Sequence, residues 1–310
     1  MRTETNTPNP QGYAGRVVTK PPAWHDLVVL DVLFNNLTTG LFLVAAVGEL
    51  AVPVVFTPVA TWGYPLALLL LLIDLGFLVL DLGDKLRFHH MLRVFKPSSP
   101  MSLGTWCLTI YSLFLTAILA AELVVILGWL PGDAGLVWWL RKLAVIGGLP
   151  FAFGSAAYKG VLFSTTAQPG WKDARWLGAY LMNSALLLGA AELLTIAALM
   201  DEMRAVSLLR PAVGLLAVIN LLPLGLLAND FYPLLANLHP RRERLATGFA
   251  IFLLGVAVPA GLLAISGGVV VALAVLVVLV LANLVVRHVI IRLPHHMGEA
   301  SHRPCPPTGS

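Results

Sequence analysis

Long apolar runs, separated by short breaks that contain proline, glycine or charged residues, make up most of this chain. A membrane-spanning helix needs about 20 predominantly apolar residues, and by that measure the sequence predicts eight spans. They cover residues 25–51, 61–83, 102–130, 137–163, 174–200, 206–228, 245–266 and 268–293. An even number of spans places both termini on the same face of the membrane.

The composition agrees with this pattern. Apolar residues make up 58% of the chain, charged residues make up 12%, and the mean hydropathy is +0.85. A soluble domain, in contrast, is roughly half apolar and a quarter charged. We therefore predict an all-α, polytopic membrane protein, with a polar segment over 1–22, one membrane domain over 23–293 built as two four-helix bundles, and a disordered tail over 294–310. The two cysteines, Cys107 and Cys305, match neither a disulfide framework nor a metal-ligand spacing.

Residues 81–106 interrupt the apolar pattern, because they mix basic and apolar positions between the second and third spans. The mixture predicts a short interfacial helix, with its apolar positions toward lipid or a neighbouring helix and its basic positions toward lipid headgroups. Pro97 ends this helix, and Ser102 is placed to cap the third span. The apolar positions are Leu86, Met91, Leu92 and Phe95, and the basic ones are Lys85, Arg87, His89, Arg93 and Lys96.

Positive charge is divided unevenly between the two faces. Of the 20 Lys and Arg residues, only Arg141, Lys142, Arg204 and Arg210 lie near the face without the termini. By the positive-inside rule, the opposite, basic face is cytoplasmic. Two explanations are open: the bias sets the orientation alone, or it also forms a docking surface for an acidic or electron-carrying subunit.

Ionisable residues inside the predicted spans carry the strongest indication of function, because such a residue is costly there unless it is paired or faces water. At about 1.5 Å of rise per residue, they fall at two main depths. Near the basic face lie Asp31, Asp81, Tyr158 and Lys159, whereas Glu49, Glu122 and Glu192 lie in the opposite half and Asp74 lies near the middle. The carboxyl groups either hydrogen-bond neighbouring helices as neutral acids or relay protons across the membrane.

The histidines argue against haem, which a transmembrane cytochrome holds between paired imidazoles at bundle depth. All eight lie at span ends, in loops or in the tail. The sequence also lacks a glycine-rich phosphate loop, a zinc motif and a Ser/His/Asp arrangement. We therefore expect any chemistry to come from carboxyl groups, a tyrosine and a bound small molecule.

The loop after the second span carries a long and chemically mixed motif. It contains Asp81-Leu82-Gly83, Arg87-Phe88, Met91-Leu92, Phe95, Pro97, Ser99-Pro100-Met101-Ser102, Gly104 and Trp106. This motif closely resembles the loop of the NrfD family, the polysulfide-reductase (PsrC-like) type of membrane subunit. Trp24-His25 at the start of the first span and residues 158–164 at the end of the fourth add to the resemblance. One departure is Asp84-Lys85, where the family more often has a basic residue followed by proline.

The resemblance implies a haem-free subunit that binds a quinone or quinol, menaquinone or ubiquinone, and anchors a respiratory oxidoreductase in the cytoplasmic (inner) membrane of a bacterium or archaeon. It also implies electron exchange with a four-cluster iron-sulfur subunit, which serves a molybdopterin enzyme or another respiratory catalytic subunit. The chain would then be the quinone-reactive subunit of a complex and not a complete enzyme alone.

In such families the quinone lies between helices of the first four-helix bundle, close to the iron-sulfur subunit. Carried onto this chain, the resemblance implies a quinone site with His25, Asp31 and Tyr158. Asp81 is then a neighbouring proton acceptor, and we expect the catalytic groups to be Asp31, Tyr158 and Asp81. The family often presents a histidine where this chain has Asp31, so Asp31 could instead be a simple partner for Lys159.

Two further sets of residues have expected roles. The carboxyl groups of Asp74, Glu49, Glu122 and Glu192 are a candidate proton path. The candidate docking surface for the iron-sulfur subunit consists of Lys85, Arg87, His89, Arg93 and Lys96. The resemblance commonly places that partner outside the cytoplasm, whereas the charge bias points inward, so the two arguments disagree about the side.

Two other functional classes compete with this hypothesis. A proton-coupled secondary transporter could use the same intramembrane carboxylates, but it would favour two similar halves with broken helices, and the sequence has no convincing half-to-half repeat. A purely structural anchor without quinone would be insensitive to substitution of Asp31 or Tyr158.

Overall fold

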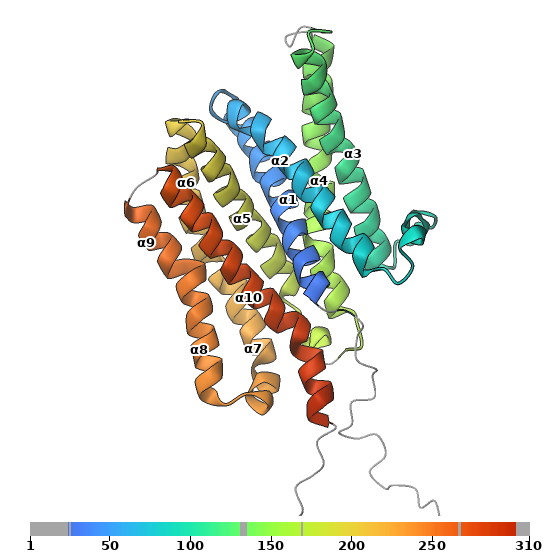
Figure 1. The fold of residues 1–310 in the computed structure, drawn as a ribbon, viewed down its shortest axis with the longest axis vertical. Coiled ribbons are helices and arrows are strands. Elements are labelled where there is room, and N and C mark those ends of the chain that lie inside the picture. Colours follow the sequence, from blue (N-terminus) through green and yellow to red (C-terminus); the bar gives the residue numbers. More distant parts are fainter. Residues whose placement is uncertain (1–23, 25, 131–134, 169, 266–267, 302–310) are drawn as a thin grey trace, which may run out of the picture.

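The computed structural model describes residues 24, 26–130, 135–168, 170–265 and 268–301. Over these ranges the chain is helical and contains no strand. Eight segments are long and apolar enough to cross a membrane, as the sequence predicts, and they lie roughly along a common direction (Figure 1). The fold is therefore that of an all-α polytopic membrane protein.

The first five spans are single helices: α1 (Asp26–Ala51), α2 (Pro53–Asp81), α3 (Pro100–Ile126), α4 (Gly135–Ser164) and α5 (Leu177–Leu199). The sixth span joins α6 (Met203–Ile219) to α7 (Leu221–Leu238). The seventh consists of α8 (Arg241–Phe252), a π-helical turn η3 (Leu253–Ala257) and α9 (Val258–Ile265). The last span belongs to α10 (Val269–Ser301), and two short 3₁₀ helices, η1 (Lys85–Leu92) and η2 (Trp171–Asp173), lie in the loops.

Three helix boundaries differ from the predicted ones by eight residues or more, and each of these differences involves proline. The second span begins at Pro53, in the first turn of α2, where a missing backbone N–H costs nothing. The sixth span runs to Leu238, past the predicted end at 228, with a proline inside α7. The last helix continues through Pro294 to Ser301, where we expected the start of a tail. Helices in membranes tolerate internal proline because neighbouring groups satisfy the freed carbonyl.

Two helices form the centre of the molecule. In the most apolar stretch of each span, 78% of the residues of α1 and 83% of those of α5 are buried. In the other six spans this share is 11–33%. The first four spans form one group around α1, and the last four form a second group around α5 (Figure 1). The remaining helices are largely apolar on their outer surfaces as well, as expected where lipid is the solvent.

Small residues let the two central helices approach closely. A methyl group on Gly40 would collide with the backbone carbonyl of Ala185, and one on Gly189 would collide with the backbone of Gly40. Close helix packing through small side chains is common in membranes, where van der Waals contact replaces the hydrophobic effect between helices. The α1–α5 contact therefore fixes the two groups against each other.

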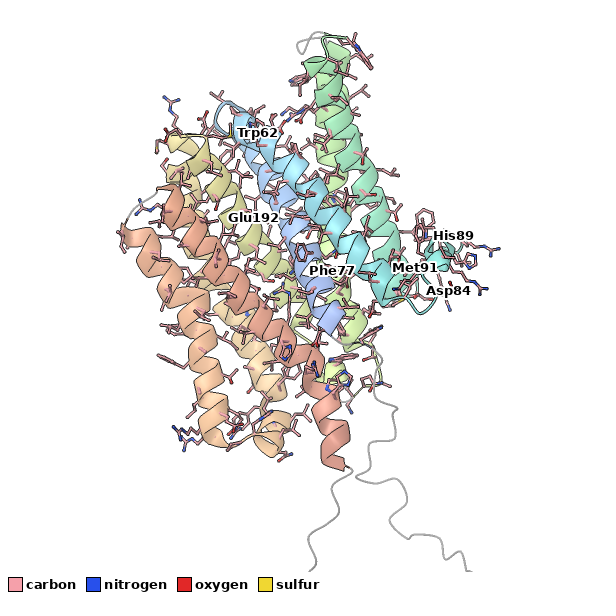
Figure 2. The ribbon with its side chains drawn as sticks, viewed as in Figure 1. Trp62, Phe77, Asp84, His89, Met91 and Glu192 are labelled. Atoms are coloured by element: carbon pink, nitrogen blue, oxygen red, sulfur yellow. The ribbon has the colours of Figure 1, made fainter. Side chains whose placement is uncertain are left out.

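The loop after α2 projects away from the bundle, as Asp84, His89 and Met91 show in Figure 2. The predicted interfacial helix is a 3₁₀ helix, η1, and its residues are mostly exposed. Ser99, rather than the predicted Ser102, caps α3, because its hydroxyl accepts a hydrogen bond from the backbone N–H of Ser102. The Ser102 hydroxyl instead bonds the loop itself, at the carbonyl of Val94, 3.2 Å away.

Candidate functional site

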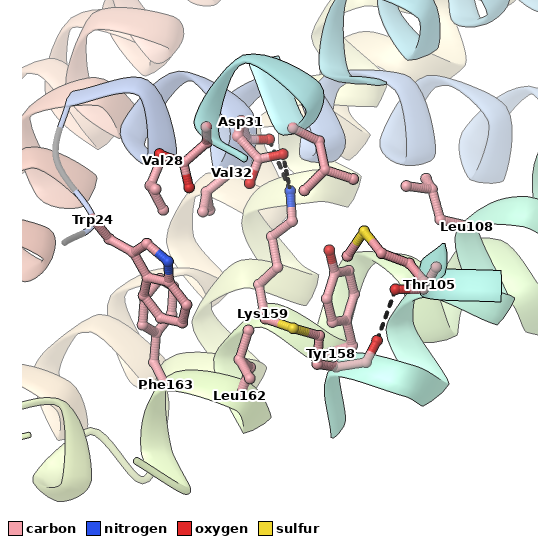
Figure 3. Close-up of a pocket in the computed structure, with 14 residues that line it drawn as sticks. Trp24, Val28, Asp31, Val32, Thr105, Leu108, Tyr158, Lys159, Leu162 and Phe163 are labelled. Carbon is pink, nitrogen blue, oxygen red and sulfur yellow. Dashed lines mark hydrogen bonds and ion pairs between the residues drawn. The ribbon is translucent and has the colours of Figure 1, made fainter. Parts of the chain in front are cut away.

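A narrow cavity lies among the first four spans, at the end where α1 and α3 begin and α2 and α4 end (Figure 3). Its volume is about 70 Å³. The side chains that line it are Trp24, Val28, Asp31, Val32, Leu78, Asp81, Met91, Met101, Thr105, Leu108, Tyr158, Lys159, Leu162 and Phe163. The helix ends thus bring Asp31, Asp81 and Tyr158, which are far apart in the sequence, around one space. His25 lies outside the described residues.

Lys159 is the electrostatic centre of this cavity. Its Nζ atom lies 2.9 Å from Oδ1 of Asp31 and 3.5 Å from Oδ1 of Asp74, and it also donates to the Asp31 backbone carbonyl at 3.0 Å. The three side chains are buried. An ion pair in such surroundings is retained only when its geometry and hydrogen bonds offset the cost of desolvation. The sequence pointed to Lys159 only as an alternative partner of Asp31, and the structure shows that this pair exists.

Neighbouring polar groups hold the carboxyl group of Asp74. Asn35 donates hydrogen bonds to Oδ2 of Asp74 at 3.2 Å and to Oγ of Ser155 at 3.1 Å. All three side chains are completely buried. Asp74, which depth placed near the middle of the membrane, therefore belongs to the Lys159 cluster. Its expected role in a proton path with the glutamates stays a prediction. Asn35 and Ser155 escaped sequence analysis because single Asn and Ser residues are common in apolar helices.

Tyr158 and Asp81 complete the polar lining. The Tyr158 side chain extends from α4 alongside Lys159 (Figure 3), and no described residue hydrogen-bonds its hydroxyl. Gly104 makes room for the ring, because any side chain at that position would collide with it. Asp81 is the last residue of α2 and is partly exposed. The cavity thus has a buried ion-paired wall and a more open wall of phenol and carboxyl groups.

A second ionic cluster lies toward the other end of the same four helices. Arg141 bonds Oε1 of Glu49 and lies 3.2 Å from Oε1 of Glu122, so one guanidinium joins two of the predicted carboxylates. Lys142 lies 3.2 Å from the same atom of Glu49, and Tyr64 donates to its other oxygen at 2.8 Å. Sequence analysis assigned Arg141 and Lys142 to orientation only, because depth along a helix does not reveal lateral partners.

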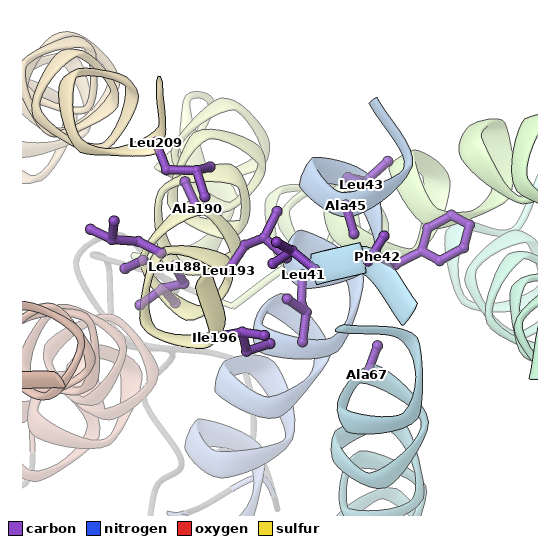
Figure 4. Close-up of a cluster of buried hydrophobic side chains, with 14 of the residues drawn as sticks. Leu41, Phe42, Leu43, Ala45, Ala67, Leu188, Ala190, Leu193, Ile196 and Leu209 are labelled. Carbon is purple, nitrogen blue, oxygen red and sulfur yellow. The ribbon is translucent and has the colours of Figure 1, made fainter. Parts of the chain in front are cut away.

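An apolar layer separates the two clusters. Phe42 lies between two tyrosine rings, with its centroid 5.1 Å from that of Tyr111 and 5.8 Å from that of Tyr64. Tyr111 bonds Thr38, at 2.9 Å, on the side of the Lys159 cluster, whereas Tyr64 bonds Glu49 on the other side. Figure 4 shows that the Phe42 ring points away from Leu188, Leu193 and Ile196, which belong to the same hydrophobic core but gather beside α5.

Glu192 stands apart from both clusters. It lies on α5 (Figure 2), its side chain is 5% exposed, and its Oε2 atom is buried with no hydrogen-bond partner among the described residues. Arg141 joins Glu49 to Glu122, but no ion pair among the described residues includes Glu192. The structure therefore brings together two of the three glutamates that sequence depth had grouped.

The five basic residues of the candidate docking surface, Lys85, Arg87, His89, Arg93 and Lys96, are all exposed. Arg87 forms an ion pair with Asp84 at 3.0 Å, and both side chains are mostly in solvent. Met91, in the same 3₁₀ helix, lines the cavity. The loop therefore presents positive charge outward and a flexible apolar side chain inward.

Eight spans with a buried ionisable site inside the first helical group define a multi-pass membrane protein with an intramembrane polar centre. The chain belongs to the NrfD family. The family model described as "Polysulphide reductase, NrfD" matches residues 18–296. The match confirms the resemblance seen in the loop. Members of this family are generally quinone-interacting membrane anchors of oxidoreductases and generally pair with iron-sulfur and catalytic subunits. A comparison with individually curated proteins found no match.

Proposed function

We propose that this chain is the haem-free, quinone-reactive membrane anchor of a respiratory oxidoreductase, and that the cavity among α1, α2, α3 and α4 binds the quinone headgroup. The observation that carries the proposal is the convergence of Asp31, Asp81, Tyr158 and Lys159 on one cavity inside the first helical group. Ionisable groups at such depth mark functional sites by default, because apolar side chains would pack there at lower cost.

The lining fits the chemistry of a quinone ring. A quinone carbonyl accepts hydrogen bonds and a quinol hydroxyl can donate them, so partners that do both are required. The Tyr158 phenol and the Asp81 carboxyl group meet that need. The volume of about 70 Å³ is below the roughly 300–1,000 Å³ usual for small-molecule sites. Ring entry therefore requires Met91 and Met101 to move, which their unbranched side chains allow.

The residues around the cavity have different roles in quinol oxidation. Oxidation of a bound quinol supplies two electrons and two protons. The Tyr158 hydroxyl orients the ring by a hydrogen bond, and both protons leave, one after the other, through Asp31 or Asp81. Lys159, whose Nζ atom lies 2.9 Å from Oδ1 of Asp31, holds that carboxyl group in place beside the cavity. Quinone reduction would use the same groups in reverse.

The electrons leave toward a partner docked on the basic loop. The exposed basic side chains of η1 suit an acidic surface, and Met91 of the same 3₁₀ helix borders the cavity. A partner seated on the loop would therefore approach the quinone site closely. This arrangement supports assignment of the partner as the iron-sulfur subunit, which in turn serves a molybdopterin or other respiratory catalytic subunit.

Proton coupling across the membrane is a further part of the proposal. Asp74 lies at the inner end of the cavity cluster, and Glu49 and Glu122 meet at Arg141 beyond the Phe42 layer. Asp74 and Tyr64 are ten residues apart on α2, or about 15 Å at the rise of an α-helix. A path through these carboxyl groups therefore requires water to cross the apolar layer, with Glu192 as an additional carrier beside it.

Replacement of Asp31 by Asn tests the quinone site, because the amide keeps the size of the side chain but accepts no proton. In the purified complex we expect quinol oxidation to slow by about 10²-fold or more. Glu122→Gln is the control at the other end of the bundle, with expected quinol kinetics near those of wild type and slower coupled proton uptake in proteoliposomes. Wild-type quinol kinetics in Asp31→Asn would refute the assignment.

A further inference from the structure

The second helical group contains a larger opening, distinct from the quinone cavity. It lies among α7, α8 and α10 and has a volume of about 510 Å³, within the roughly 300–1,000 Å³ range of small-molecule sites. Its deeper lining is apolar and includes Leu227, Phe231, Ile251 and Val286. Its outer end lies where α7 ends and α8 begins, at the level of the basic membrane face.

The charged residues of this groove gather at that outer end. His239 is paired with Glu243 at 3.2 Å, and Arg292 is paired with Asp26 at 2.7 Å. His288 also faces Asp26, at 3.8 Å. These pairs leave Arg244 as the lining cation with no carboxylate partner among the described residues.

Arg244 presents unused hydrogen-bond donors. Its Nε and Nη1 atoms are buried, and no described residue accepts a hydrogen bond from either. The guanidinium lies 5.1 Å from the centroid of the Tyr232 ring, a cation–π contact that fixes its plane. A guanidinium with unused donors at the rim of an apolar groove is suited to the oxygens of a phosphate group, which arginine binds through charge-assisted hydrogen bonds.

We propose that this groove is a specific site for an anionic phospholipid. The phosphate binds the guanidinium of Arg244 at headgroup level, and an acyl chain lies along the apolar wall toward Ile251 and Val286. A quinone suits the site less well, because its ring bears no anionic group to neutralise an unpaired guanidinium. The exposed Arg241 and Arg242, on the same turn but outside the groove, add general attraction without a fixed contact.

The test measures lipid binding to the purified full-length chain by native mass spectrometry, with unfolding temperature as a second readout. The added probes are phosphatidylglycerol, phosphatidylcholine and inorganic phosphate. We expect tight binding of one phosphatidylglycerol, weaker binding of phosphatidylcholine, and no stabilisation by phosphate alone. Arg244→Gln should weaken phosphatidylglycerol roughly tenfold or more, as expected for loss of charge-assisted hydrogen bonds.

Two further variants make the result specific. Arg242→Gln removes one positive charge, as Arg244→Gln does, but from a residue outside the groove. It should leave phosphatidylglycerol binding nearly unchanged. Gly248→Leu fills open space in the groove wall, since nothing lies within 4 Å of a Cβ atom there, and should weaken both lipids. Three results would overturn the proposal. They are equal binding of the two lipids, a loss of phosphatidylglycerol binding in Arg242→Gln equal to that in Arg244→Gln, and displacement of the lipid from the Arg244 site by an added quinone.

Discussion

A single lysine sets the charge balance of the proposed quinone cavity. Lys159 faces two carboxyl groups, at 2.9 Å and 3.5 Å, in a buried setting. One ammonium compensates one carboxylate, so uptake or release of one proton changes the net charge of the trio. A site of this kind can hold a proton from quinol close to the ring and pass it on, which a simple one-to-one ion pair does less readily.

Replacement of Lys159 by Met should show the cost of removing that charge. Two buried carboxyl groups would lose their cation, and loss of one partner of a buried ion pair costs about 3–5 kcal/mol. We expect a lower unfolding temperature in detergent together with loss of quinol oxidation. Lys159→Arg keeps the charge and should recover most of the thermal stability. An unfolding temperature in Lys159→Met equal to that of wild type would contradict the central place given to this residue.

At the scale of secondary structure, the short 3₁₀ helix η1 contributes both to the candidate docking surface and to the lining of the cavity. Its basic side chains face outward, and Met91 reaches the cavity. The loop is fixed to α3 through Ser102, whose hydroxyl bonds Val94 and accepts from the backbone N–H of Lys96 at 3.0 Å. A partner that binds the loop could therefore influence access to the cavity without touching the helices.

Reversal of charge in this loop tests the docking surface. Arg87→Glu combined with Arg93→Glu should weaken copurification of the iron-sulfur subunit, roughly tenfold in affinity at low salt and less at high salt. Lys172→Glu combined with Arg175→Glu, two exposed residues at the same end of the bundle, is the matched control. Equal losses in the two double variants would show that general charge, and not this loop, attracts the partner.

At the scale of the whole molecule, α1 and α5 hold the two helical groups together. Their backbones meet at Gly40 and Gly189, and a polar chain crosses the same boundary. Asn36 donates to Oγ of Ser184 at 3.0 Å, and Arg287 of α10 donates to the same oxygen at 3.0 Å. The first group, which contains the proposed quinone cavity, is thus tied to the second by both packing and hydrogen bonds.

Gly189→Leu tests this junction, because the new side chain would collide with the backbone of α1. Overpacking of a tight contact costs about 1–3 kcal/mol, so we expect a lower unfolding temperature and weaker quinol oxidation together. Gly214→Leu on α6, where a Cβ atom would meet open space, is the control and should behave like wild type. The same unfolding temperature for both variants would contradict the claim that the close contact between α1 and α5 stabilises the protein.

Much of this architecture could be predicted from apolar runs, because lipid requires each span to be long and continuous. Depth along the spans also placed Asp31, Asp81 and Tyr158 at one level, and the structure places them around one cavity. Depth could not show which helices are neighbours. Arg141 therefore went unrecognised as the link between two glutamates, and the ion pair between Asp74 and Lys159 was not predicted.

The most direct test of the quinone site is photolabelling of the purified complex with a photoreactive quinone, followed by peptide mapping. We predict labels in residues 81–108 and 158–163, which contribute most of the cavity lining, and loss of labelling when excess natural quinone competes. Competed labels confined to α7, α8 or α10 would contradict the assignment, because they would place the quinone in the second helical group.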